Sequence, residues 1–217
     1  MGRSGGLRIF LLSPASCTGK RARQIVSATA QFSLAQDLRG TAGAQLGDVF
    51  SFCSALYFRG KLAYAREFTS PPDANDPLIG GGVLVITPNA GLLPADTRIT
   101  RVAFQDFATE PIDVTNPGYR RPLEEGAHAL LARVGADCEV VLLGSIASGK
   151  YVDVLAPIFG DRLLFPTAFV GRGDMSRGGL MLRSVESGQE LLYEPVATAV
   201  RRGDRPPKLE PVAARRR

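Results

Sequence analysis

The stretch that decides the fold runs from Cys138 to Gly179 and reads CEVVLLG-SIASGK-YVDVLAPIFG-DRLLFP-TAFVGRGDMSRGG. An apolar run typical of a strand is followed by a loop of small residues, a helical segment, a second apolar run and a polar loop. Two of these loops place backbone N–H groups beside cationic side chains, which suits a negatively charged ligand. The stretch therefore predicts a strand–helix–strand unit of an α/β domain with a ligand at its loops.

The rest of the chain continues this alternation. Continuous apolar runs at 7–12 and 83–87 predict two more strands that are buried on both faces. Helical spacing is found in four further segments, 20–38, 48–68, 101–108 and 123–134. In the longest of them Arg59, Lys61 and Arg66 are expected to face outward. Gly60 is expected to mark a break or a close contact there.

The order of these segments predicts the architecture. Because strands alternate with helices, we expect a three-layer α/β/α sandwich with a mainly parallel central sheet. Segments 180–185 and 190–196 flank Ser-Gly-Gln and predict a C-terminal β-hairpin. Residues 1–200 are expected to form a single domain and residues 201–217 a basic, disordered tail.

The net charge of +5 belongs to that tail. Residues 201–217 carry seven basic and two acidic side chains, which accounts for the whole excess over the 217 residues. A basic tail can contact phosphates, although a solvated end explains the composition equally well. The charge therefore does not by itself indicate a nucleic-acid-binding fold.

Composition argues against several classes of protein. The apolar fraction is 45%, typical of a globular chain, and no apolar run is long enough to span a membrane. Three cysteines without CxxC spacing favour reduced thiols, and one histidine, His128, leaves no zinc set. We expect a cytoplasmic protein without a metal or other cofactor and without a membrane partner.

The loop after the third apolar run nearly matches a phosphate-binding pattern. Residues 144–151, GSIASGKY, fit GxxxxGK[ST] except at Tyr151, which replaces the hydroxyl residue that would hold Mg²⁺. This mismatch argues against a true nucleotide triphosphatase and leaves two interpretations of the loop. One is a metal-free loop that binds an anion or a sugar-phosphate, and the other is a tight turn that needs small residues for packing.

Two more loops are expected at the same edge of the sheet. Residues 13–20 follow the first strand and lead into a helix, so their N–H groups are predicted to face a ligand. Asn89 follows the second strand, where such sheets bind ligands. Cys17 lies in the first loop, but a thiol nucleophile needs a base, and His128 lies in a polar helix. A hydrolase that uses Cys17 is a further alternative.

The loop at 171–177, GRGDMSR, combines free N–H groups, two arginines and a carboxylate. Arg172 or Arg177 suits bidentate contacts to phosphate or a base, with Asp174 as a possible salt-bridge partner instead of a functional group.

Five segments together resemble a known family: LLSPASCTGKRA, LYFRGKLAYAREF, VLVITPNAGLLPADTRI, VVLLGSIASGKYVDVL and FPTAFVGRGDMSRGGLMLR. They resemble an uncharacterised bacterial family whose domains occur beside archaeosine-type tRNA-modifying enzymes and which is similar to the uracil-DNA-glycosylase fold. The likeness covers about residues 7–183. It carries over Leu56, Tyr57, Tyr64, Ala65, Gly91, Asp96, Gly171 and Gly173. The opening LLSP also resembles a bacterial peroxide-stress family that binds DNA.

These observations predict a protein that binds a nucleotide or a nucleic acid, with metal-free cleavage at a nucleoside as the expected chemistry. A non-enzymatic module that binds nucleic acid or protein is the alternative. Asp96 and Asp174 are the candidate catalytic residues, as groups that orient water. The candidate ligand-binding residues are Ser13, Ser16, Thr18, Gly19, Lys20, Asn89, Gly144, Ser145, Ser148, Gly149, Lys150, Gly171, Arg172, Gly173 and Arg177.

Overall fold

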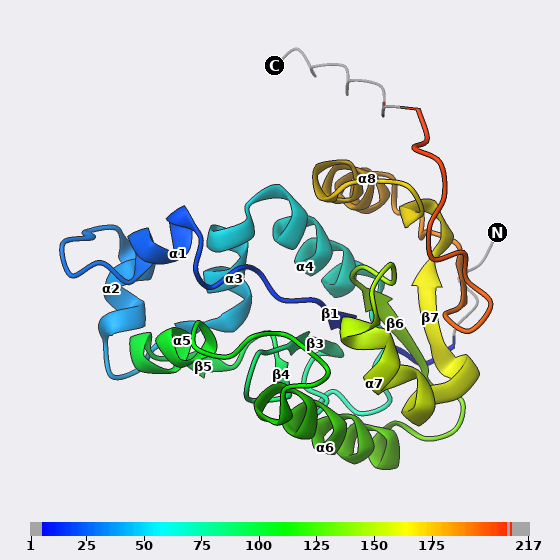
Figure 1. The fold of residues 1–217 in the computed structure, drawn as a ribbon, viewed down its shortest axis with the longest axis horizontal. Helices are drawn as coiled ribbons and strands as arrows, with labels where there is room; N and C mark the ends of the chain where they lie inside the picture. Colours follow the sequence, from blue (N-terminus) through cyan, green and yellow to red (C-terminus); the bar gives the residue numbers. More distant parts are fainter. Residues whose placement is uncertain (1–5, 208, 210–217) are drawn as a thin grey trace.

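The computed structural model describes residues 6–207 and 209, and a six-stranded sheet lies at its centre (Figure 1). The strand order is β4-β3-β1-β6-β7-β8, with four parallel inner strands and an antiparallel strand at each edge. In chain order these strands are β1 (Arg8–Leu12), β3 (Val83–Ile86), β4 (Leu92–Pro94), β6 (Glu139–Leu143), β7 (Leu163–Pro166) and β8 (Tyr193–Pro195). A small antiparallel pair joins β2 (Ala44–Gln45) to β5 (Arg98–Ile99).

The strand β1 occupies the middle of the sheet because it is apolar on both faces. Its residues from Ile9 to Leu12 are completely buried. Leu12 pairs with Val85 of β3 on one side and with Leu143 of β6 on the other. Parallel strands covered on both faces need such continuous apolar runs, which is how the sequence indicates them.

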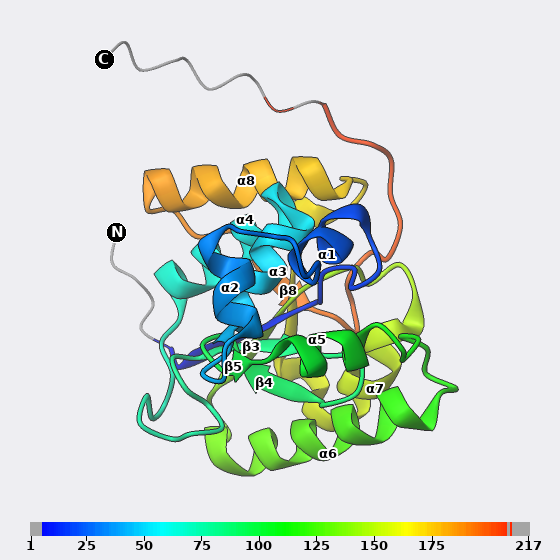
Figure 2. The same ribbon diagram turned by 90° about the vertical axis from the view of Figure 1, so that its left-hand side faces the viewer.

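Helices cover both faces of the sheet (Figure 2). On one face α4 (Leu56–Phe68) packs against β1 and β3, and α8 (Asp174–Ser187) packs along α4. On the other face α7 (Gly149–Phe159) packs against β7 and against α6 (Pro117–Val134). The remaining helices are α1 (Lys20–Ile25), α2 (Ser33–Arg39), α3 (Leu46–Ser54), α5 (Arg101–Phe107) and the 3₁₀ turns η1 (Gly160–Arg162) and η2 (Thr167–Phe169).

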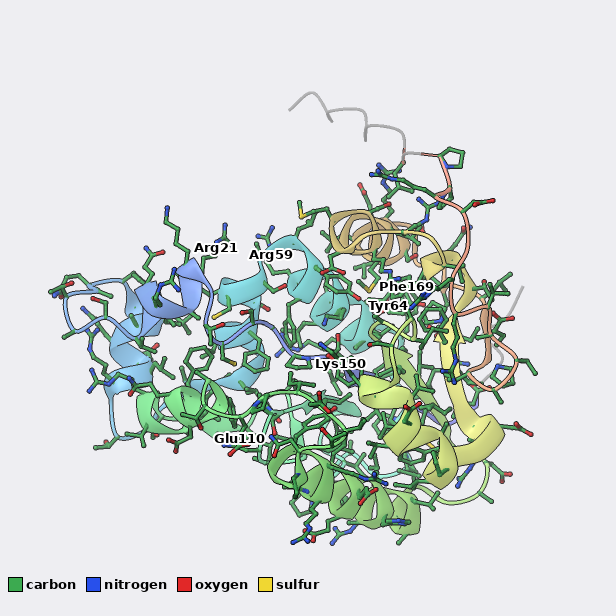
Figure 3. The ribbon with its side chains drawn as sticks, viewed as in Figure 1. Arg21, Arg59, Tyr64, Glu110, Lys150 and Phe169 are labelled. Carbon is green, nitrogen blue, oxygen red and sulfur yellow. The ribbon has the colours of Figure 1, made fainter. Side chains whose placement is uncertain are left out.

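The predicted three-layer α/β/α fold with a mainly parallel sheet is confirmed, and so is a C-terminal antiparallel pair of strands. The pair consists of β7 and β8, whereas residues 180–185 belong to α8 and not to a hairpin arm. Tyr64 of α4 helps to hold the last strand, since its hydroxyl bonds to that of Tyr193 and accepts a hydrogen bond from the Leu191 N–H at 2.8 Å (Figure 3).

Two predicted helices are each divided in two. The segment 20–38 forms α1 and α2 with a turn between them. The segment 48–68 forms α3 and α4, and the break falls at Ala55, which has φ 49° and ψ −120°. Gly60 lies inside α4, where a close contact replaces the expected break: a Cβ on it would lie 2.7 Å from the Gly178 carbonyl oxygen.

The order of the strands creates a switch point between β1 and β6. The connection from β1 to β3 passes through α4 on one face, whereas the connection from β6 to β7 passes through α7 on the other face. The loops that leave β1 and β6 therefore diverge at the carboxyl edge of the sheet. Open α/β sheets bind ligands in the crevice that such divergence leaves.

The basic tail is described only in its first part. Residues 201–207 run past η2 and the start of α8, where Arg172 Nη1 donates to the Pro207 carbonyl at 3.3 Å. The disorder is predicted for all of residues 201–217, of which residue 208 and residues 210–217 lie outside the described residues.

Candidate functional site

A cavity of about 390 Å³ opens at the switch point and is called the Ser13 cavity below. Its lining comes from four separate stretches of the chain: residues 13–16 after β1, residues 53–57 where α3 meets α4, residues 145–151 between β6 and the first turn of α7, and Asp174 at the start of α8. The side chains that matter for its chemistry are Ser13, Ser16, Tyr57, Ser145, Tyr151 and Asp174. Its volume falls in the range of small-molecule sites.

Ser13 is fixed at the floor of this cavity because it is the first residue after β1. Its N–H donates to the Leu143 carbonyl at 3.1 Å, which continues the pairing of β1 with β6 by one bond. Pro14 follows and lacks the N–H that a further ladder bond requires. A Cβ on Gly144 would lie 3.0 Å from the Ser13 Cβ, so glycine there leaves room for the serine. In the structure Gly144 thus has a packing role.

The second wall is formed by Ser145 and Tyr151, on either side of the start of α7. Ser145 Oγ accepts a hydrogen bond from the Ala147 N–H at 3.3 Å, which holds the loop in a turn. The first turn of α7 is tied to α6 by the Tyr119 hydroxyl, which donates to the Lys150 carbonyl at 2.8 Å. Burial raises the pKa of Tyr151, and a hydrogen bond with Ser13 partly offsets this effect.

Behind Ser13 lies a lysine that the sequence placed on the surface. Lys61 is 1% exposed, and its Nζ donates to the Ser13 carbonyl and lies 2.9 Å from Ser13 Oγ. The same nitrogen lies 4.4 Å from the centroid of the Tyr57 ring and 4.8 Å from that of Phe58. The prediction that Lys61 faces outward is therefore wrong. The break at Ala55 starts a new helix whose buried side includes Tyr57, Lys61 and Tyr64.

Burial governs the protonation of Lys61. Loss of solvent lowers the pKa of its amine from 10.5 to about 7, and Arg177 acts in the same direction while Asp174 opposes it. The neutral amine is thus accessible near neutral pH. This matters because a neutral amine can accept a proton, whereas an ammonium group can only donate.

Tyr57 gives the cavity an unused donor. Its side chain is 7% exposed, and its buried hydroxyl donates to no group in the described part of the chain. Burial raises the pKa of this hydroxyl, and Arg177 lowers it by a smaller amount, through its charge and as a hydrogen-bond donor to the hydroxyl oxygen. A buried hydroxyl whose proton has no acceptor is costly, so a donor of this kind in a cavity wall is expected to serve a ligand.

Asp174 and Arg177 come from the first turn of α8, which the sequence assigned to a loop. Asp174 is exposed at the rim of the Ser13 cavity. Arg177 is buried, and its Nε donates to the Phe169 carbonyl at 3.1 Å while its guanidinium lies 5.4 Å from the Phe169 ring centroid. Arg177 therefore contributes charge behind the wall and is not free to chelate a phosphate.

A second cavity, of about 460 Å³, lies on the other side of the Ala15–Ser16 ridge. Thr18 and Lys150 line it, together with the segment 107–112 that contains Glu110 (Figure 3). Among the predicted ligand residues, Ser16 reaches both cavities, whereas Thr18 and Lys150 reach the second one.

The glycine–arginine loop faces a third region. Arg172 and Gly173 line a cavity of about 360 Å³ with residues 205–207 and 209. Arg172 Nε donates to the Ala168 carbonyl at 3.0 Å and Nη1 to Ser176 Oγ at 3.2 Å. Gly171 has φ +69°, and a Cβ there would lie 2.0 Å from the Asp204 carbonyl oxygen. This loop thus supports the start of the tail.

The remaining predicted residues lie apart from these cavities. Gly19, Lys20, Ser148 and Gly149 begin α1 and α7, as the N-cap and first residue of each helix. Asn89 Nδ2 donates to the Asp106 carbonyl at 3.2 Å, which ties the loop after β3 to α5. Asp96 follows β4, which is antiparallel to β3, so it lies at the opposite edge of the sheet from Ser13. The structure does not bring Asp96 and Asp174 together.

No family model, curated protein sequence or solved structure matches the chain.

Two features, a metal-binding cluster and a membrane-spanning helix, are absent from the part of the chain that the structure describes. There, no group of three or more His, Cys, Asp or Glu side chains is arranged to hold a metal ion. Nor does any helix among those residues have both the length and the apolar character needed to cross a bilayer.

The residue that the sequence analysis missed is Lys61, and one signal for it exists. Tyr57, Lys61 and Tyr64 are spaced by four and three positions, the repeat of a single helix face. Lysine on an apolar face is unusual and is a reason to look for a partner. Its partner, Ser13, is 48 residues away in the chain, so spacing alone does not identify it.

Proposed function

We propose that the Ser13 cavity binds a nucleoside or a nucleotide, free or as a unit of a nucleic acid, and cleaves its N-glycosidic bond without a metal. One observation carries the proposal: Ser16, Ser145 and Asp174, from three distant segments, line one cavity at the switch point of an α/β sheet. The resemblance to glycosylase-like domains motivates the choice of a nucleoside as substrate.

The lining suits such a ligand. Serine hydroxyls both donate and accept, as sugar hydroxyls require, and Tyr57 and Tyr151 add aromatic surface for a base. Arg177 lies behind the wall and gives the cavity a positive interior that favours a sugar-phosphate.

The chemistry would use Asp174 at the rim. Its carboxylate would hold a water molecule and take a proton from it as the water oxygen bonds to the anomeric carbon. The bond from that carbon to the base nitrogen breaks, and the departing base takes up one proton as Asp174 gives up the proton it received, so that the carboxylate is restored. The products are a free base and a sugar with a new hydroxyl group.

The test uses the full-length protein with nucleosides, nucleoside monophosphates and uracil-containing single-stranded DNA. Calorimetry measures binding, and chromatography measures released base. We expect Asp174→Asn to bind normally and to release base at least about 100-fold more slowly, the loss typical of a removed general base. Asp153→Asn, a carboxylate on the exposed side of α7, is the matched control and should behave as wild type.

The outcomes separate the two functions expected from the sequence. Binding without release of base would favour the non-enzymatic module. If none of these ligands binds to the wild-type protein, the proposal fails.

A further inference from the structure

A serine hydroxyl and a buried amine form a pair that the proposed nucleoside chemistry does not use. Ser13 Oγ and Lys61 Nζ lie 2.9 Å apart, within hydrogen-bond distance. In the described part of the chain no carboxylate lies within salt-bridge distance of Lys61, although the charges of Asp174 and Arg177 reach it, and its other direct contacts are with the Ser13 carbonyl and two aromatic rings. A buried lysine without a counter-ion is rare as a purely structural element.

The neutral amine is fully satisfied in this arrangement. It has two N–H groups and one lone pair. One N–H donates to the Ser13 carbonyl, and the other can point at the face of the Tyr57 ring, 4.4 Å from the nitrogen to the centroid. In the structure Nζ also donates to Ser13 Oγ at 2.9 Å. When the amine has lost a proton, its lone pair can take the place of this N–H and accept the Ser13 hydroxyl proton. A neutral amine in this position can act as a general base toward the Ser13 hydroxyl.

Ser13 is placed to react. It lines the Ser13 cavity at the end of β1, immediately before Pro14 ends the strand pairing. The absence of a side chain at Gly144 leaves the space beside its Cβ clear. Its hydroxyl therefore lies between the base and the cavity, as a nucleophile requires.

The cavity also holds a donor for the negative charge that such an attack creates. Tyr57 is one of the residues that line the same cavity, and its hydroxyl, which is buried behind the cavity surface, donates to no group in the described structure. Tyrosine hydroxyls act as donors to oxyanions, and a preorganised donor in a water-poor site contributes strongly. Ser13 Oγ and the ring of Tyr57 both lie against the Lys61 nitrogen, at 2.9 Å and, to the ring centroid, 4.4 Å.

We propose that Ser13 is a nucleophile activated by Lys61, with Tyr57 as oxyanion donor, and that the Ser13 cavity hydrolyses small carboxylic esters. The cavity volume of about 390 Å³ limits the substrate to a small molecule. This activity is separate from nucleoside cleavage and does not depend on it.

The reaction balances with water alone. Ser13 Oγ bonds to the carbonyl carbon while its proton moves to Lys61 Nζ, and Tyr57 donates to the carbonyl oxygen. The bond from the carbon to the leaving alkoxide breaks, and the alkoxide takes the proton from Lys61. Water then attacks the acyl-serine, giving its proton to Lys61, and the Ser13 oxygen recovers that proton as the acid leaves.

Several charged groups surround the pair and enter its pH dependence. Asp174 and Arg177 of α8 act on Lys61 in opposite directions, and Tyr151 of α7 interacts with Ser13. Tyr57 lies on the same helix as Lys61. The rate of attack should rise as Lys61 loses its proton, from acid pH to a plateau above about pH 7.

The test is covalent labelling of the full-length protein by a fluorophosphonate, in which a serine oxygen displaces fluoride from phosphorus. Peptide mapping by mass spectrometry should place the label on Ser13, and Ser13→Ala should remove it. Lys61→Met and Lys61→Arg should each slow labelling by about 100-fold or more, whereas Lys20→Met, an exposed lysine, should not. With p-nitrophenyl acetate as substrate, Tyr57→Phe should lower kcat by a larger factor than it raises KM.

Labelling of wild type at another residue, or at Ser13 with a rate that neither Lys61 variant changes, would overturn the proposal. If a Lys61 variant does not fold, the pH profile of wild-type labelling decides instead. A rate without a rise between about pH 5 and 8 would then exclude an amine of this pKa as the base. Binding of nucleosides is measured separately, so either proposal can fail alone.

Discussion

Gly60 of α4 and Gly178 of α8 face each other at the point where the two helices cross. A Cβ on Gly60 would lie 2.7 Å from the Gly178 carbonyl oxygen, and one on Gly178 would lie 2.7 Å from the Leu56 carbonyl oxygen. These neighbours are backbone atoms and cannot rotate away. The contact sets the distance between Lys61 on one helix and Arg177 on the other.

Replacing either glycine by alanine should push α8 away from α4. We expect Gly60→Ala and Gly178→Ala each to lower the free energy of unfolding by about 1–3 kcal/mol, the usual cost of overpacking. Urea unfolding measures the change. Gly81→Ala is the matched control because a Cβ there meets nothing within 4 Å, and it should change stability by less than about 0.5 kcal/mol. If Gly60→Ala and Gly81→Ala changed the free energy of unfolding equally, the close contact between α4 and α8 at Gly60 would be contradicted.

Ala55 stores strain beside the Ser13 cavity. Its φ of 49° and ψ of −120° suit glycine, and the residues before it, Cys53 and Ser54, line the cavity. We expect Ala55→Gly to raise the free energy of unfolding by about 1 kcal/mol, since relief of strain exceeds the entropic cost of glycine. The control is Ala63→Gly inside α4, which should lower stability by about 1 kcal/mol. A loss of stability in both variants would show that Ala55 is unstrained.

The sheet follows from the sequence because its strands are long apolar runs. Both β1 and β6 are buried on two faces, so the physical requirement and the local pattern coincide. Helix α8, in contrast, cannot be recognised from its local sequence pattern. Its segment contains Gly178 and Gly179 and few apolar residues, and its position depends on packing against α4. Local pattern does not contain that information.

Part of the lining of the Ser13 cavity follows from the sequence. The loops after β1 and β6 were predicted to meet at the carboxyl edge of the sheet, and Ser13, Ser16, Ser145 and Asp174 do line one cavity there. Lys150 and Arg172 looked equivalent in sequence but face other cavities, because side-chain direction depends on the turn of each loop. The burial of Lys61 cannot be predicted from the helical pattern of segment 48–68, because the break at Ala55 starts a new helix with a different buried side.

The thiols should be slow to react. Burial raises the pKa of Cys17 and of Cys53 to about 12 and that of Cys138 to about 11. Since the thiolate is the nucleophile, we expect iodoacetamide to modify the native protein near pH 8 about 100-fold more slowly than the urea-unfolded chain. Mass spectrometry of timed samples gives both rates. Rapid modification of native Cys17 would instead support the alternative function, a hydrolase that uses Cys17 as its nucleophile.

Lys61 should make stability depend on pH in a way that can be isolated. Its pKa is lowered in the folded protein from 10.5 to about 7, so between these values the unfolded chain binds more protons than the folded one. The free energy of unfolding should therefore rise with pH across this window, by at most about 1.4 kcal/mol per pH unit. Below about pH 7 both states are protonated, and the destabilising effect of the buried charge is fully present.

The comparison that isolates this effect is wild type against Lys61→Met, with urea unfolding at about pH 6, 8 and 9.5. The cysteines and tyrosines also titrate differently in the two states, but they are common to both proteins and cancel in the difference. We expect the stability of wild type relative to Lys61→Met to increase from pH 6 to 9.5, and Lys20→Met to track wild type throughout. A difference that stays constant with pH would mean that Lys61 keeps its proton in the folded protein, and it could not then serve Ser13 as a base.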